Sequence, residues 1–156
     1  MLVSNGEFLP FVEDGGYHKK EYWSEEAWKW MEQEKATKPL YWWDSPTGYK
    51  LKTLTQLIDL PMDWPAEVNY HEAAAFCAWK GEKIGKKLEI PTEDESLAMR
   101  EQFKGDYRTL PIRNMGNIDL QYWSSPCPVN MFKYGEVYDL IGNVWQLTRT
   151  PYYPFE

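Results

Sequence analysis

Histidine and cysteine are scarce in this sequence of 156 residues, which has two of each. Two cysteines, Cys77 and Cys127, are too few for a disulfide-stapled scaffold, and we expect both thiols to be reduced. An iron site with three histidines, or with two histidines and a carboxylate, needs converging imidazoles. His18 lies beside lysines and His71 in the first turn of a predicted helix, where a cation is disfavoured. The sequence therefore predicts that this chain holds no metal of its own.

Positive charge and long apolar runs are also in short supply. The 17 Lys and Arg residues are outnumbered by 24 Asp and Glu, which gives a net charge of −7. Nucleic-acid binders instead carry a basic stripe on one face. No apolar run approaches the roughly 18 residues that cross a bilayer, and the first residues lack the basic and apolar regions of a secretion signal. We expect a cytoplasmic protein with no nucleic-acid partner and no membrane partner.

Aromatic residues, in contrast, are abundant. Trp, Tyr and Phe number 9, 11 and 6 and make up 17% of the chain. Buried rings contribute large apolar areas, and Trp and Tyr also carry a polar group. The long segments 40–65 and 106–134 contain many of these rings, and we predict that both are mostly loop. The length fits one domain whose irregular loops are packed by indole and phenol rings.

Four helix starts are marked by capping residues. The predicted helices begin after Ser4, Ser24, Asn69 and Thr92 and end near 14, 35, 81 and 103. A glutamate three residues after the first, third and fourth caps has the spacing of a capping box. Short strands are predicted at 88–90, 137–140 and 144–148. This mixture favours an α+β fold.

The segment Gly142–Gln146 is a turn that leads into the last of these strands. Gly142 permits unusual dihedral angles, and Asn143 is suited to tie the turn to the backbone. We predict that Trp145 fills the core, in which case Trp145→Ala costs about 3–5 kcal/mol.

Three stretches in order carry a family resemblance. They contain the motifs SNGEF, NYHEA, IPTEDE and YDLIGNVWQLT, within residues 3–17, 68–95 and 138–148. Together they resemble the formylglycine-generating-enzyme-like (sulfatase-modifying-factor) domain. Residues 60–65, 124–129 and 150–156 are similar to the 5-histidylcysteine sulfoxide synthases of the ovothiol pathway, with the related ergothioneine enzymes as neighbours. The resemblance implies a C-type-lectin-like version of the α+β fold.

The resemblance also implies how the parent enzyme works. Such enzymes are non-heme iron oxidoreductases that couple cysteine to a histidine derivative with O2, and a helical bundle domain supplies the three histidines that hold Fe(II). Residues 1–156 are expected to be the N-terminal part of one such domain, incomplete at its C-terminus. The chain would then form one wall of the substrate site and be catalytically inert alone. An unpaired edge at 144–148 would make it marginally stable and prone to associate.

Several site residues and alternatives follow. Amino-acid substrates need cations for their carboxylates, and stacking needs rings. The candidate substrate-binding residues are Arg108, Arg113, Tyr122 and Trp123. Many relatives bind calcium at the segment matching Gly142–Gln146. Here the neutral Gln146 replaces a glutamate, which weakens the attraction for calcium. Cys127, between two prolines, remains open as a positioned thiol.

Two other functions remain open at this point. A free-standing lectin-like binding module would present rings to solvent as a platform, since fold does not decide function. Its candidate residues are Trp42, Trp43, Tyr122 and Trp123. A fragment of a formylglycine-type oxidase would instead need a close cysteine pair, which the spacing of Cys77 and Cys127 does not indicate.

Overall fold

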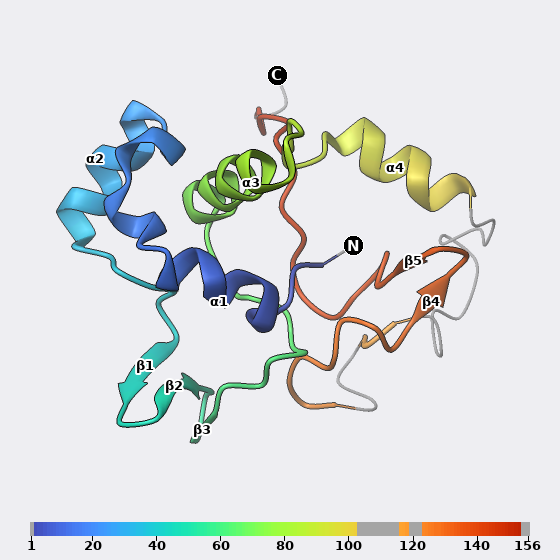
Figure 1. Ribbon diagram of the computed structural model, residues 1–156. Helices are drawn as coiled ribbons and strands as arrows, with labels where there is room; N and C mark the ends of the chain where they lie inside the picture. The colour runs from blue at the N-terminus through green and yellow to red at the C-terminus, as the bar shows by residue number, and fades with distance from the viewer. Residues whose placement is uncertain (1, 103–115, 119–122, 154–156) are drawn as a thin grey trace.

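The computed structural model describes residues 2–102, 116–118 and 123–153 of the chain (Figure 1). In chain order the elements are α1 (Asn5–Glu13), η1 (Gly16–His18), η2 (Lys20–Tyr22), α2 (Glu25–Glu34), β1 (Trp42–Ser45), β2 (Gly48–Lys52), β3 (Leu57–Asp59), α3 (Tyr70–Ile84), α4 (Glu93–Gln102), β4 (Lys133–Tyr134) and β5 (Val137–Tyr138). The fold is α+β, as predicted. In the part of the chain so described, no helix is both long and apolar enough to cross a membrane.

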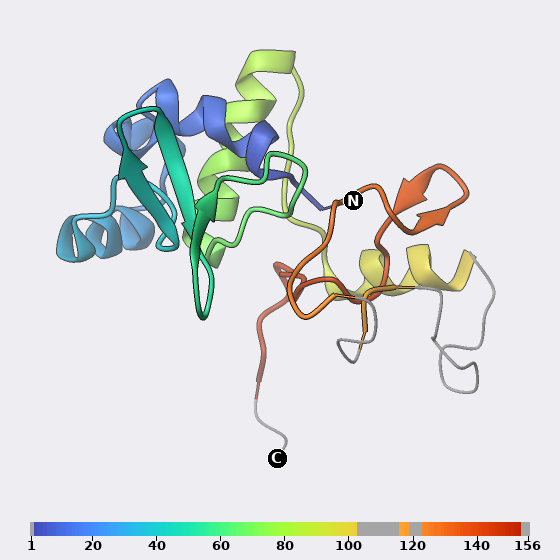
Figure 2. The same ribbon diagram turned by 90° about the horizontal axis from the view of Figure 1, so that it is seen from below.

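The elements form two groups along the molecule. Helices α1, α2 and α3 lie with the sheet β1–β3 on one side, and α4 lies with the hairpin β4–β5 on the other (Figures 1 and 2). Backbone hydrogen bonds join the two groups. The N–H of Val129 donates to the carbonyl oxygen of Asp63 at 2.8 Å, and the N–H of Arg149 donates to that of Pro91 at 2.9 Å. The C-terminal segment is therefore tied to both groups.

The predicted capping residues are confirmed as helix starts. In α1, the Ser4 hydroxyl accepts the N–H of Glu7 at 3.2 Å, and the Glu7 carboxylate accepts the N–H of Ser4 at 3.0 Å. Asn69 and Glu72 repeat this box at α3. Reciprocal bonds also join Thr92 to the glutamate at the third position of α4, and Ser24 caps α2. These bonds satisfy N–H groups that the first helical turn leaves without partners.

Helix α3 is longer than its sequence predicts. It continues through Gly81 to Ile84 and is capped by Gly85, which adopts a φ of 64°. Gly81 serves close packing instead, because a Cβ there would lie 2.5 Å from the carbonyl oxygen of Lys86. Of two glycines four residues apart, the one with a left-handed conformation ends the helix.

The core is a cluster of aromatic rings between α1 and α3. Phe11 has no exposed surface, and its ring centroid lies 5.6 Å from Tyr17, 5.8 Å from Trp79 and 6.2 Å from Phe76. Phe8 stacks on Phe76 at 5.1 Å. These separations are those at which aromatic pairs attract beyond their buried area.

One buried polar pair crosses this core. The Tyr17 hydroxyl donates to the Glu72 carboxylate at 2.6 Å, and both side chains are buried. Burial raises the pKa of Glu72, while the hydrogen bonds from Tyr17 and the N–H of Asn69 lower it. The same glutamate thus completes the cap of α3 and connects that helix to η1.

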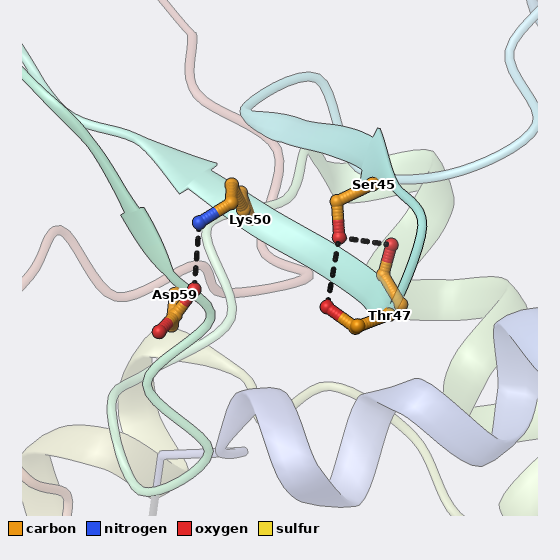
Figure 3. A network of polar contacts seen from close by, with 5 residues as sticks. Ser45, Thr47, Lys50 and Asp59 are labelled. Carbon is orange, nitrogen blue, oxygen red and sulfur yellow. Dashed lines mark hydrogen bonds and ion pairs between the residues drawn. The ribbon is translucent and has the colours of Figure 1, made fainter.

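Residues 42–59 form a three-stranded antiparallel sheet, which the prediction of mostly loop over 40–65 did not include. Trp42, Leu51 and Ile58 are aligned across it and face the core, and Trp42 is 2% exposed. The outward face pairs Lys50 with Asp59, whose charged atoms lie 2.7 Å apart (Figure 3). Strands are recognised by alternation of apolar and polar residues, and the adjacent tryptophans of this segment hide that alternation. The sequence pattern therefore did not indicate these strands.

Of the three strands predicted after residue 87, only one is present in part. Strand β5 confirms the start of 137–140, but neither 88–90 nor 144–148 is a strand. Residues 144–148 form no strand, so the unpaired strand edge expected there is not present. Association of the chain stays a prediction. Trp145 is 100% exposed, and the prediction that it fills the core is wrong.

We expect the buried tyrosine pair to matter more than an exposed counterpart. Tyr17→Phe deprives the buried Glu72 carboxylate of a donor, which should cost about 1–3 kcal/mol of unfolding free energy in urea. Tyr22→Phe is the matched control, because Tyr22 donates to Glu82 at the same 2.6 Å at an exposed position. Equal losses in the two variants would contradict the role given to Tyr17.

The two tryptophans that differ most in burial give a second prediction. Trp42→Ala should lower the free energy of unfolding by about 3–5 kcal/mol, since it removes a buried indole. Trp145→Ala should change it by less than about 0.5 kcal/mol. Chemical denaturation of both variants tests this, and a large loss from Trp145→Ala would place that ring in the core after all.

Candidate functional site

A tight turn at 139–146 is the centre of the candidate site. Asp139, Gly142 and Asn143 have positive φ angles of 50°, 77° and 64°. At Gly142 a Cβ would lie 2.8 Å from the carbonyl oxygen of Asn117, so a larger residue does not fit. Three left-handed residues within five positions make a compact turn, and aspartate and asparagine tolerate that conformation better than most residues. We call residues 139–146 the 139–146 knot.

Asn143 holds this knot to a distant segment. Its Oδ1 accepts the N–H of Cys127 at 2.8 Å, and its Nδ2 donates to the carbonyl oxygen of Cys127 at 2.9 Å. Its own N–H donates to the carbonyl oxygen of Asn117 at 3.0 Å. The prediction that Asn143 ties the turn to the backbone is confirmed.

Asp139 is the electrostatic anomaly of the knot. It is 1% exposed, and neither carboxylate oxygen accepts a hydrogen bond from any described residue. Burial raises its pKa to about 6. The sequence prediction did not include this residue, although an aspartate inside the apolar run at 137–140 was a signal. The buried Asn117 also has a side-chain oxygen without a donor in the described part of the chain.

The Cys127 thiol is buried in the same knot. Burial, followed by the nearby charge of Asp139, raises its pKa to about 11. The thiol is therefore protonated at neutral pH and is a poor nucleophile. The geometry favours a structural role over a reactive one.

The side chain of Gln146 serves the turn itself. Its Nε2 donates to the carbonyl oxygen of Asp139 at 2.8 Å, which closes the segment on itself. That bond gives Gln146 a structural partner. Weak attraction for calcium at Gly142–Gln146 stays the prediction.

The predicted substrate-binding residues are only partly placed. Arg108, Arg113 and Tyr122 lie outside the described residues. Trp123 is half-buried, and its ring meets the edge of Phe132 at 6.4 Å. Their role in binding substrate stays a prediction.

Trp42 and Trp43 do not share one face of the proposed ring platform. Trp42 belongs to the core, whereas Trp43, on the outer face of the sheet, is 49% exposed. The ammonium of Lys52 lies 5.2 Å from the Trp43 ring. Because adjacent residues of a strand point to opposite faces, Trp42 and Trp43 cannot share one surface.

The histidines do not fit an iron centre. His18 is exposed in η1, and His71 is half-buried on α3, where its ring lies 5.7 Å from that of Trp30. Over the described ranges, no group of three His, Cys, Asp or Glu side chains is arranged to hold a metal ion. No step of chemistry at iron can be derived from these residues.

The motif-bearing turn lies within a stretch that a known family model matches. The model of the sulfatase-modifying factor enzyme 1-like domain matches residues 1–155. The chain belongs to this family. Membership confirms the resemblance seen in the sequence motifs.

Individual relatives are similar over the same length. Hercynine oxygenases of Mycolicibacterium thermoresistibile and Mycobacterium tuberculosis are each 29% identical, over 98% of this chain and 35% and 37% of their own length. The inactive C-alpha-formylglycine-generating enzyme 2 of Mus musculus is 28% identical over 97% of the chain and 57% of its own length. The chain thus spans about a third of the length of the hercynine oxygenases.

The buried carboxylate gives a pH prediction. The folded-state pKa of Asp139 is about 6 and the unfolded value is about 3.8, so the folded state binds this proton more tightly. The stabilisation that comes from the protonated Asp139 carboxyl is present at low pH and is lost as pH rises from about 4 to 6. Asp139→Asn should remove that loss and raise the free energy of unfolding at pH 7 by about 3 kcal/mol.

Denaturant titrations between pH 4 and pH 7 measure this difference. Asp63→Asn is the matched control, because the Asp63 side chain is exposed. If Asp139→Asn destabilised the protein at pH 7, the carboxylate would have a favourable partner and the account of this knot would be wrong.

Proposed function

We propose that this chain is part of an iron-dependent sulfoxide synthase that couples cysteine to histidine with O2, as in ovothiol biosynthesis. The family match over residues 1–155 is the observation that carries the proposal. The hercynine oxygenases among its relatives support an oxidative reaction on a histidine-derived substrate. Motif details at 60–65 and 124–129 favour the ovothiol branch.

We further propose that residues 1–156 are the N-terminal part of one C-type-lectin-like domain in a cytoplasmic enzyme. The α+β architecture and the short antiparallel strands agree with such a fold. The coverage of about a third of the hercynine oxygenases supports a larger parent. Fe(II) would then be held by a helical bundle domain, with cysteine and histidine bound between that domain and this one.

Within such an enzyme, this chain would shape the substrate site. The aromatic core and the 139–146 knot provide rigid backbone, which is what precise positioning requires. Arg108 and Arg113 would bind substrate carboxylates through guanidinium forks, and Tyr122 and Trp123 would supply ring surface. Iron, when bound by the partner domain, would supply O2 activation.

A binding module is the second candidate function. It is favoured by one observation, the complete exposure of Trp145, with Tyr152 and Tyr153 also exposed on the same segment. A formylglycine-type oxidase is less well supported. Cys77 and Cys127 are both free, and one lies on α3 while the other is buried in the knot.

An experiment on metal content and product formation tests the proposal. The purified chain should bind no Fe(II) above background and form no carbon–sulfur product from cysteine, histidine and O2. The longest natural protein that contains this chain should bind Fe(II) and form the carbon–sulfur product. In that protein, Arg113→Gln should raise KM about 10-fold or more, since a charged pair is lost.

Arg100→Gln, on α4, is the control and should leave KM unchanged. If the chain alone bound stoichiometric iron and His71→Ala lost it, the proposal that another domain holds the iron would be contradicted. A long protein that oxidises neither amino acid would contradict the proposed reaction and favour the binding module.

A further inference from the structure

Strand β3 is one edge of the three-stranded sheet, with β2 between it and β1 (Figure 2). At the β2–β3 turn the N–H of Thr53 donates to the carbonyl oxygen of Gln56 at 2.9 Å. In an antiparallel ladder, bonded and unbonded pairs alternate. Leu57 and Asp59, one and three positions further along the same register, therefore lie in unbonded pairs. Their N–H and C=O groups point away from β2.

These outward-pointing backbone groups have no partner in the described part of the chain. No described residue donates to the carbonyl oxygens of Leu57 and Asp59 or accepts their N–H groups. The opposite edge of the sheet is partly satisfied, because the N–H of Trp42 in β1 donates to the carbonyl oxygen of Pro39 at 3.0 Å. A row of unused donors and acceptors on a strand edge is a template for another strand. The ligand that fits this edge is extended polypeptide.

The edge of β3 is complementary to a copy of itself. Two β3 strands placed antiparallel about a two-fold axis at Ile58 bring Leu57 of one copy opposite Asp59 of the other. In that register both pairs exchange N–H···O=C bonds, because all the groups involved point outward. The two three-stranded sheets then join into one. Such a contact uses the same patch on both copies and is closed by its own symmetry.

Charges on the outer face of the sheet favour a second copy over an unrelated peptide. The Asp59 carboxylate is 94% exposed and contacts Lys50 through Oδ1 at 2.7 Å (Figure 3), so Oδ2 is left without a described partner. Lys52 lies on the same face, opposite Leu57 in the register. Its ammonium lies over the Trp43 ring and forms no ion pair with any described residue.

In the paired sheets, the Lys52 of each copy lies two strands from the partner's Asp59. Two strand spacings are about 10 Å, which a lysine extended over Leu57 spans. Symmetry makes two such ion pairs. Leu57 is 49% exposed and Leu54, in the adjoining turn, is fully exposed, so apolar surface accompanies the charges. Apolar surface rimmed by polar groups is typical of interaction sites.

We propose that two copies of this chain associate through antiparallel pairing of their β3 strands, with reciprocal ion pairs between Lys52 and Asp59. An edge of three residues buries less than the roughly 1,200 Å² of a standard interface, so the dimer is weak and transient. The proposal does not depend on the reaction proposed for the parent enzyme, because none of these residues is a candidate substrate ligand.

Sedimentation equilibrium of the chain measures the association directly. We expect a dissociation constant of about 0.1–1 mM, with an average mass that rises from one copy to two and no further. A mass of one copy at every concentration up to about 2 mM, or growth beyond two copies, would overturn the proposal.

A charge exchange tests the orientation of the two strands. Lys52→Glu and Asp59→Lys each place like charges at both contacts and should weaken self-association about 10-fold or more. An equimolar mixture of the two variants has opposite charges at both contacts and should regain the original affinity within about 3-fold. Lys38→Glu, at a lysine paired with Asp44 beside β1, is the matched control and should have no effect. A mixture no tighter than either variant alone would refute the reciprocal pairs.

The backbone contact has its own test. Leu57→Pro removes one outward N–H and should abolish the dimer while the monomer stays folded, because an edge strand accepts proline where the N–H faces solvent. Leu57→Val keeps the N–H and should keep the dimer. In NMR spectra of the unchanged chain, the amides of Leu57 and Asp59 should shift saturably with concentration, and that of Asp44 should not. Shifts confined to the exposed segment around Trp145 would overturn the proposal even if the chain dimerised.

Discussion

The packing of Phe11 is the interaction on which the rest of the structure depends. Its ring touches aromatic partners from η1 and α3, and it also requires Gly16, where a Cβ would lie 2.1 Å from the ring. Helix α1, the chain reversal after it and α3 are thereby fixed together. The indole N–H of Trp79 also donates a hydrogen bond to the Asp14 carboxylate, at 3.0 Å.

Helix α3 connects this aromatic core to the rest of the molecule. One of its faces carries Phe76 and Trp79 into the core, while Ala74 and Ala78 lie on another face beside a groove. The residues after it run back along the helix and are held by the segment around Arg149.

Local signals in the sequence were enough to predict the helices but not the placement of individual rings. Capping boxes act over three residues, so Ser4 and Asn69 could be identified from spacing alone. Trp42 and Trp145 have the same chemistry and opposite burial, because long-range packing decides which ring has a partner. The same holds for Asp139, whose burial depends on segments that sequence spacing does not connect. Family motifs were informative because their order spans the whole chain.

Native-state hydrogen exchange tests the central claim, that one aromatic cluster stabilises α1 and α3 as a unit. Amides in both helices should exchange with the same, highest free energy of opening, and Phe11→Leu should lower it equally in both. The β4–β5 hairpin should exchange with a lower free energy. Independent opening of α1 and α3, or a loss confined to α1 in the variant, would contradict the account.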